Sequence, residues 1–113
     1  MSDRKLLEYA AKAAGMWKTD FALDEDDLPI YDAKRGMYLS WGRGYWNPCN
    51  DNGNALQLAI KLHINLEFES YEVVAKTFIN FGANISELPN GQTIEEATRR
   101  AIVRAAAEIG KAM

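Results

Sequence analysis

Three stretches of the chain space their apolar residues as a helix does. The first begins at about Arg4, with Ser2 or Asp3 as its N-cap, and stops before Gly15, a residue type that often follows a helix. Its inward positions recur every three or four residues and are Leu6, Leu7, Ala10, Ala11, Ala13 and Ala14. The pattern predicts an amphipathic first helix.

The second stretch follows Asp51, whose carboxylate suits an N-cap. A narrow polar stripe of Asn54, Gln57 and Lys61 separates its apolar positions, which are Ala55, Leu56, Leu58, Ala59, Ile60 and Leu62. A stripe this narrow predicts a largely buried helix, with a sheet on one side and another helix or subunit on the other.

The third stretch begins with a capping-box sequence, Thr93 followed by Glu96. Its inward stripe is rich in alanine, which lets a helix lie close to a sheet, and consists of Ile94, Ala97, Ala101, Ile102, Ala105, Ile109 and Ala112. We therefore expect a last helix from Ile94 almost to the end of the chain.

Basic residues gather on one flank of this last helix. Arg100, Arg104 and Lys111 project together when residues are spaced about 100° apart. A solvated face is the simpler interpretation, because Glu96 and Glu108 stand four residues from Arg100 and Arg104 and can pair with them. The alternative is an edge at which Arg100 and Arg104 contact an anionic ligand.

Two regions between the helices have the residue types of strands. Three short runs separated by turn residues predict an antiparallel meander, at 29–32, 37–41 and 44–46. Strict alternation over 64–69 and β-forming residues over 71–81 predict a long hairpin, and 82–91 is expected to be a loop.

Together these elements predict an α+β fold, formed by a single domain over residues 1–113. We expect an antiparallel sheet sandwiched by helices, an α/β/α-type arrangement of two or three layers. The order along the chain is helix–meander–helix–hairpin–helix.

Composition is that of an ordinary soluble protein, with 48% apolar and 26% charged residues. A net charge of −3 argues against nucleic acid as a partner. No apolar run approaches the roughly 20 residues that span a membrane, and no signal-peptide pattern is present. The single cysteine, Cys49, allows no internal disulfide. These features predict a cytoplasmic protein that does not cross a membrane.

Catalytic chemistry is sparsely represented. Cys49 precedes the second helix and His63, the only histidine, follows it, so a nucleophile and base pair between them is disfavoured. The acidic block 24–27 lacks calcium-loop spacing and is interpreted as a solvated loop. The sequence therefore predicts no catalytic residue, no metal site and no cofactor.

The aromatic stretch before the second helix offers binding chemistry. Trp41, Tyr45 and Trp46 supply flat rings for a planar ligand, Arg43 supplies a planar cation, and Asn47 supplies a paired donor and acceptor. The nearby helix N-terminus favours an anion such as phosphate. The stretch predicts a nucleotide-type pocket. The alternative is that the rings fill the core, since Tyr45 and Trp46 are adjacent and only one of them can face outward on a strand.

The same stretch and the last helix resemble a known family. The residues concerned are Tyr45-Trp46-Asn47-Pro48 with Asp51, then Ala55-Leu56 and Leu58-Ala59, then Glu96 to Ile102 and Ala105-Ala106. They resemble small phage-encoded proteins of the NinX-like and phage ABA sandwich type. The resemblance implies an α/β sandwich and a phage or prophage origin, and it brings no catalytic residue.

These observations lead us to expect a non-enzymatic phage accessory protein in the host cytoplasm. It would bind and sequester a small nucleotide-like ligand, such as a host-defence signalling molecule, as a homo-oligomer. The expected ligand-binding residues are Trp41, Arg43, Tyr45, Trp46, Asn47, Arg100 and Arg104. The alternative is a protein–protein inhibitor of a host defence or metabolic factor.

Overall fold

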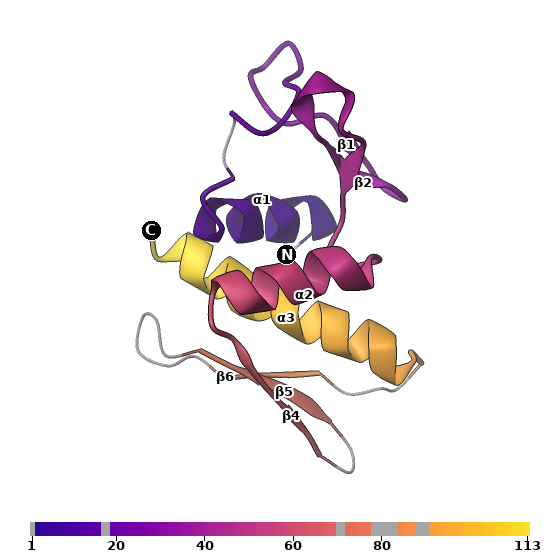
Figure 1. The fold of residues 1–113 in the computed structure, drawn as a ribbon, viewed down its shortest axis with the longest axis vertical. Helices are drawn as coiled ribbons and strands as arrows, with labels where there is room; N and C mark the ends of the chain where they lie inside the picture. The colour runs from indigo at the N-terminus through magenta and orange to yellow at the C-terminus, as the bar shows by residue number, and fades with distance from the viewer. Residues whose placement is uncertain (1, 17–18, 70–71, 78–83, 88–90) are drawn as a thin grey trace.

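The computed structural model describes residues 2–16, 19–69, 72–77, 84–87 and 91–113 (Figure 1). Within them the chain forms three α-helices and two small antiparallel sheets, which confirms the mixed α+β class. The helices are α1 (Asp3–Ala13), α2 (Asn52–Lys61) and α3 (Ile94–Lys111). The first sheet contains β1 (Tyr31–Asp32), β2 (Gly36–Tyr38) and β3 (Tyr45–Trp46), and the second contains β4 (Asn65–Phe68), β5 (Val73–Lys76) and β6 (Asn84–Glu87). None of the described helices combines the length and apolar content that crossing a membrane requires.

The three helices begin at the N-caps that the sequence predicts. Ser2, Asp51 and Thr93 each accept a hydrogen bond from the backbone N–H three residues further along the chain. Such a bond satisfies an amide group that the first turn of a helix leaves without an intrahelical partner. Beyond the end of α1, Gly15 has a φ of 74°, the left-handed conformation in which glycine commonly follows a helix.

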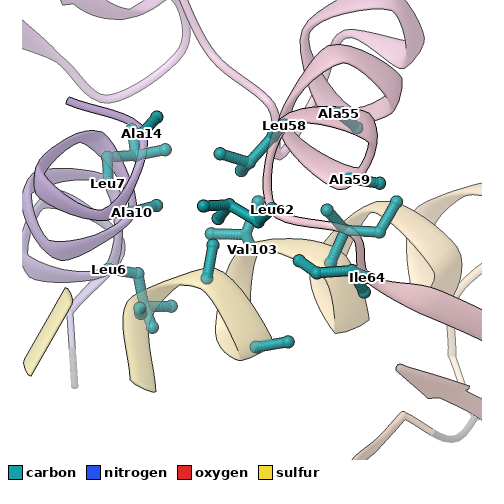
Figure 2. Packing of buried hydrophobic residues seen from close by; sticks show 14 of the residues in the cluster. Leu6, Leu7, Ala10, Ala14, Ala55, Leu58, Ala59, Leu62, Ile64 and Val103 are labelled. Atoms are coloured by element: carbon teal, nitrogen blue, oxygen red, sulfur yellow. The ribbon is translucent and has the colours of Figure 1, made fainter. Parts of the chain in front are cut away.

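The hydrophobic core lies where the three helices meet. In Figure 2, Leu7 from α1 and Leu58 and Leu62 from α2 and its C-cap point into the space beside Val103 of α3. α3 packs against α1 and α2 and also lies over β5 and β6 (Figure 1). The last helix is therefore the element to which the other two helices and the second sheet attach.

The contact between α1 and α3 is closest at Gly110. A Cβ atom at this position would lie 1.9 Å from the carbonyl oxygen of Tyr9 in α1. Ala106 and Ala107, one turn earlier in α3, are almost completely buried. Small residues of α3 thus let α1 and α3 approach each other closely.

The strands form two separate sheets where the sequence suggested one sheet between helices. β1, β2 and β3 pair antiparallel in chain order, as the expected meander, and lie beyond α1 at one end of the molecule (Figure 1). Met37 and Trp46 are cross-strand partners in this sheet and both belong to the core. β4, β5 and β6 lie on the opposite side of the helices.

The second sheet contains one strand more than the predicted hairpin. β6 pairs with β5, with Ile85 opposite Ala75, inside the segment 82–91 that was expected to be a loop. Its sequence, Asn-Ile-Ser-Glu, has one apolar residue and so carries little of the alternation that marks a strand. Pairing with β5 overrides this weak local preference. Residues 71 and 78–81 of the predicted second strand lie outside the described residues.

The expectation of a largely buried α2 is wrong. The helix buries one face, made up of Ala55, Leu58 and Ala59. Its open face holds Leu56 and Ile60, which are 58% and 64% exposed. Ile94, expected on the inward stripe of the last helix, is the first residue of α3 and is 51% exposed, and Ala112 is exposed beyond the helix C-terminus. The fold therefore leaves apolar side chains open to solvent.

Substituting Gly110 tests the close contact of α1 and α3. Alanine is favoured over glycine in an isolated helix by about 1 kcal/mol. Here we expect Gly110→Ala to lower the free energy of unfolding by about 1–3 kcal/mol, because the new Cβ would push α1 away from α3. Gly53→Ala in α2 is the matched control, since its Cβ would meet the Asp51 carboxylate at 3.1 Å and no backbone atom. Thermal unfolding followed by circular dichroism compares them, and unchanged stability of Gly110→Ala would contradict the contact.

Candidate functional site

The aromatic stretch turns tightly between β2 and β3. The turn is a short 3₁₀ segment, η1 (Ser40–Gly42), in which Trp41 has a φ of 64°. Left-handed backbone is uncommon for a residue other than glycine, asparagine or aspartate and costs of order 1–3 kcal/mol. The indole of Trp41 lies at the surface and the residue is 93% exposed.

Arg43, directly after this turn, is held in one orientation. Its Nε donates to the carbonyl oxygen of Ser40 at 3.0 Å, and its Nη2 donates to the carbonyl oxygen of Asp20 at 3.0 Å. Nη2 also bonds to the Ser40 hydroxyl at 3.2 Å and lies 3.6 Å from the Asp20 carboxylate. These contacts use Nε and Nη2, so the third guanidinium nitrogen, Nη1, is the group that Arg43 offers to a ligand.

The two adjacent rings of β3 face opposite sides, as strand alternation requires. Trp46 faces inward, is 5% exposed and packs at 6.0 Å from the ring of Phe21. Tyr45 faces outward, with the Tyr38 ring 5.0 Å away and the Arg35 guanidinium 5.6 Å from its centroid. The Trp46 ring therefore lies in the core, and the Tyr45 ring lies on the outer face of the sheet.

Asn47 is buried and fixes the loop that leads into α2. Its side-chain oxygen accepts from the backbone N–H of Cys49 at 3.1 Å, and its side-chain nitrogen donates to the carbonyl oxygen of Lys34 at 3.4 Å. Its backbone N–H donates to Oδ1 of Asn54 at 2.9 Å. From α3, Arg99 donates to the carbonyl oxygen of Cys49 at 2.9 Å. The loop is thus anchored to the first sheet, to α2 and to α3.

A cavity of about 290 Å³ lies between α2 and segment 39–46, with Ala14 and Met16 beside it. Arg43 and Lys61 supply two cations to it, and we call it the Arg43–Lys61 cleft. Its other lining residues are the amides Asn54 and Gln57 and the apolar Ala14, Met16, Leu39, Trp46 and Leu58. A mostly apolar floor with a few polar groups is the usual composition of a small-molecule site.

The narrow polar stripe of α2 forms one wall of this cleft. Asn54, Gln57 and Lys61 stand at i, i+3 and i+7, which places them on one face of a helix. This spacing is visible in the sequence, but the sequence does not show that the stripe faces Arg43. Lys61, Gln57 and Asn54 were therefore absent from the predicted site residues.

Tyr45 and Asn47 line a different cavity, of about 310 Å³. Lys34 and Arg35 contribute cations there, and Asn54 borders both cavities. Arg35 and Tyr38, which accompany the Tyr45 ring, were also missed from sequence. Tyr38 is the cross-strand partner of Tyr45, a relation that a predicted meander register could have supplied.

Arg100 and Arg104 line a third cavity, of about 360 Å³, away from the aromatic stretch. Arg100 bonds to Asp3 of α1 at 3.1 Å, rather than to Glu96 four residues earlier. Arg104 is paired with Glu87 of β6. The structure thus divides six of the seven predicted residues among three cavities, and Trp41 lines none of these three.

Cys49 lies mostly buried beside the start of α2. Burial raises the pKa of its thiol from the usual 9.0 to about 11, the Asp3 charge adds to the rise, and Arg100 and Arg99 oppose it. The thiol is therefore protonated at neutral pH. His63 lies exposed beyond the other end of α2.

Carboxylates do not gather into a metal site in the described part of the chain. No group of three or more His, Cys, Asp or Glu side chains there is placed to hold a metal ion. The acidic block 24–27 is exposed, and the Asp24 carboxylate closes its turn by accepting from the backbone N–H groups of Asp26 and Leu28.

No protein-family model, curated protein or solved structure matches this chain. The resemblance to NinX-like and phage ABA sandwich proteins therefore remains a prediction from the residues that carry it.

Trp46 and Trp41 provide a matched pair of substitutions. We expect Trp46→Ala to lower the free energy of unfolding by about 3–5 kcal/mol, because it empties a core position. Trp41→Ala removes an exposed ring and should change stability by less than about 0.5 kcal/mol. Urea unfolding followed by far-ultraviolet circular dichroism measures both. Equal stabilities of the two variants would be inconsistent with the inward position of Trp46.

The raised pKa of Cys49 predicts a specific loss of stability at alkaline pH. The unfolded thiol ionises near pH 9 and the folded thiol near 11, so within this window the folded state holds a proton that the unfolded state has released. Relative to Cys49→Ala, the wild type should lose about 1–2 kcal/mol of unfolding free energy as pH rises through the window. Parallel pH curves for the two proteins would show that Cys49 is not buried.

Proposed function

We propose that this protein is a non-enzymatic binding protein that captures a small nucleotide-like anion in the Arg43–Lys61 cleft. The observation that carries the proposal is the joint placement of Arg43 and Lys61 beside the apolar floor of one cavity. Trp46 contributes to that floor, so two of the residues expected from sequence lie together here.

Most of the polar groups in the cleft donate hydrogen bonds, and the side-chain amide of Gln57 can both donate and accept. Arg43 offers Nη1 and Lys61 offers its ammonium group. The side-chain oxygen of Asn54 accepts a hydrogen bond from the backbone N–H of Asn47, so its side-chain NH₂ group is open to a ligand. A ligand rich in acceptor oxygens, such as a phosphate ester, matches this set, and its planar part matches the apolar floor.

The size of the cleft limits the ligand. Its volume of about 290 Å³ lies at the lower end of small-molecule sites. A mononucleotide-sized molecule is therefore a better candidate than a dinucleotide. Among the described lining residues there is no carboxylate, imidazole, thiol or hydroxyl side chain, which supports capture over turnover.

The biological setting in this proposal rests on the resemblance described above. A phage accessory protein in the host cytoplasm that sequesters a host-defence signal, as a homo-oligomer, would need affinity and stoichiometry rather than a catalytic group. The alternative is a protein–protein inhibitor, and the observation favouring it is the exposed apolar surface that includes Leu56, Ile60 and Ile94.

Alanine variants of the two cations test the cleft. We expect Arg43→Ala and Lys61→Ala each to raise the Kd for the bound mononucleotide roughly tenfold or more, because each removes a charge-assisted hydrogen bond. Isothermal titration calorimetry with adenosine and guanosine monophosphates, linear and cyclic, supplies the measurement. Native mass spectrometry of the same mixtures shows whether the ligand is bound intact.

Lys34→Ala is the matched control, because Lys34 is an exposed cation of the neighbouring cavity. Its affinity should equal that of the wild type. A loss of affinity confined to the Lys34→Ala variant would indicate that the ligand binds in that neighbouring cavity. Absence of binding by the folded wild type to all four nucleotides would reject the proposal and favour a protein partner.

A further inference from the structure

Outside the Arg43–Lys61 cleft, an apolar groove lies where α2, α3 and β4 meet. The groove has a volume of about 350 Å³. Apolar side chains from all three elements line it, namely Leu56, Leu66, Phe68, Ile94 and Ile102. Three of these, Leu56, Phe68 and Ile94, are each more than half exposed. A soluble protein seldom leaves such a cluster uncovered unless a partner covers it.

Beside the groove, β4 is an edge strand. In the described residues the sheet order is β4-β5-β6, so one side of β4 has no neighbour. The N–H of Glu69 bonds to the carbonyl oxygen of Glu72, and antiparallel alternation then directs the backbone groups of Glu67 toward β5 as well. The backbone N–H and C=O groups of Leu66 and Phe68 consequently point to the open side.

β4 is a short strand of four residues, but it has few of the other devices that protect an edge. Its sequence, Asn-Leu-Glu-Phe, contains no proline, glycine or lysine, and Glu67 is directed to the face where it pairs with Lys76 at 2.8 Å. The side chains of Leu66 and Phe68 line the groove. The open backbone and the apolar side chains thus favour the same kind of partner, another strand with an apolar face.

We propose that a second copy of this chain occupies the groove, by antiparallel pairing of β4 with β4 across a two-fold axis. The pairing would join the two sheets into one of six strands. This inference names the interface of the homo-oligomer in the proposed function. It does not depend on ligand binding, and its test uses no ligand.

The segment from Ile64 to Phe68, which is β4 and the residue before it, is complementary to itself in one register. With Leu66 opposite Leu66 of the second copy, Phe68 stands opposite Ile64, and the apolar residues of each strand meet. In the same register Glu67 meets Asn65. The paired segment ends at Ile64, because His63 has a φ of 52° and the Ile64 N–H bonds to the carbonyl oxygen of Ala59 in its own copy. Centring the axis on Glu67 instead would oppose two like charges, which is destabilising. This complementarity is the reason for assigning the groove to a second copy.

The two-fold axis also accounts for the open face of α2. An axis perpendicular to a continuous sheet keeps the helices of both copies on the same side of that sheet. α3 lies over β5 and β6, and α2 borders the groove at β4. Leu56 and Ile60 of the two copies would therefore approach each other above the joined strands.

The test is the mass of the full chain in solution, with one edge substitution. We expect sedimentation equilibrium to give a particle of twice the 12.7 kDa chain mass. Phe68→Lys should raise the dimer Kd at least tenfold, because it places a charge in the paired edge. Glu67→Gln, one residue earlier on the opposite face, is the control and should remain dimeric.

A cysteine substitution tests the register independently. Leu66→Cys should form an intermolecular disulfide under mild oxidation, since opposed residues in paired strands are within about 5.5 Å. Glu67→Cys should not, because its counterpart lies diagonally about 7–8 Å away. The wild type, which contains Cys49, gives the background.

Each outcome decides the proposal. The proposal is supported by a dimer that dissociates in the Phe68→Lys variant and forms the disulfide in the Leu66→Cys variant. If Phe68→Lys fails to fold, the result for Leu66→Cys is decisive. A monomeric wild type overturns it. So does a dimer that fails to cross-link through Leu66→Cys, because that dimer uses another surface or register.

Discussion

The close approach of α1 and α3 is the constraint on which the rest of the structure depends. It requires a glycine at position 110, where any side chain would collide with the Tyr9 carbonyl. Because α3 is held in this way, its other sides can receive α2 and the second sheet. The chain thus brings its first and last helices together, although they are separated by most of the sequence.

The candidate cleft depends on this arrangement through the loop before α2. Arg99 of α3 holds that loop by bonding to the carbonyl oxygen of Cys49 and to the side chain of Asn52. Asn47 ties the same loop to the first sheet through Lys34. With its N-terminus fixed from both sides, α2 presents its polar stripe to Arg43. The site is therefore assembled by tertiary contacts, rather than by one contiguous motif.

Local signals in the sequence were sufficient for the helices and for the first sheet. Ser2, Asp51 and Thr93 mark helix starts by short-range hydrogen bonding, which needs no knowledge of the fold. β6 and the open face of α2 could not be predicted in this way, because each depends on which neighbour is present. The candidate site was likewise predictable only where local sequence signals determine it. Alternation correctly placed Tyr45 and Trp46 on opposite faces, but the partners of Arg43 come from a separate helix.

One short helix borders both proposed surfaces. α2 has only 10 residues, with Asn54, Gln57 and Lys61 along the cleft and Leu56 and Ile60 on the face assigned to the second copy. A rigid rod of about three turns cannot shift at one surface without shifting at the other. If a ligand displaces α2, it must alter self-association, and thermodynamic reciprocity makes self-association alter ligand affinity by the same factor. In the proposed dimer, α2 would therefore couple ligand binding to self-association.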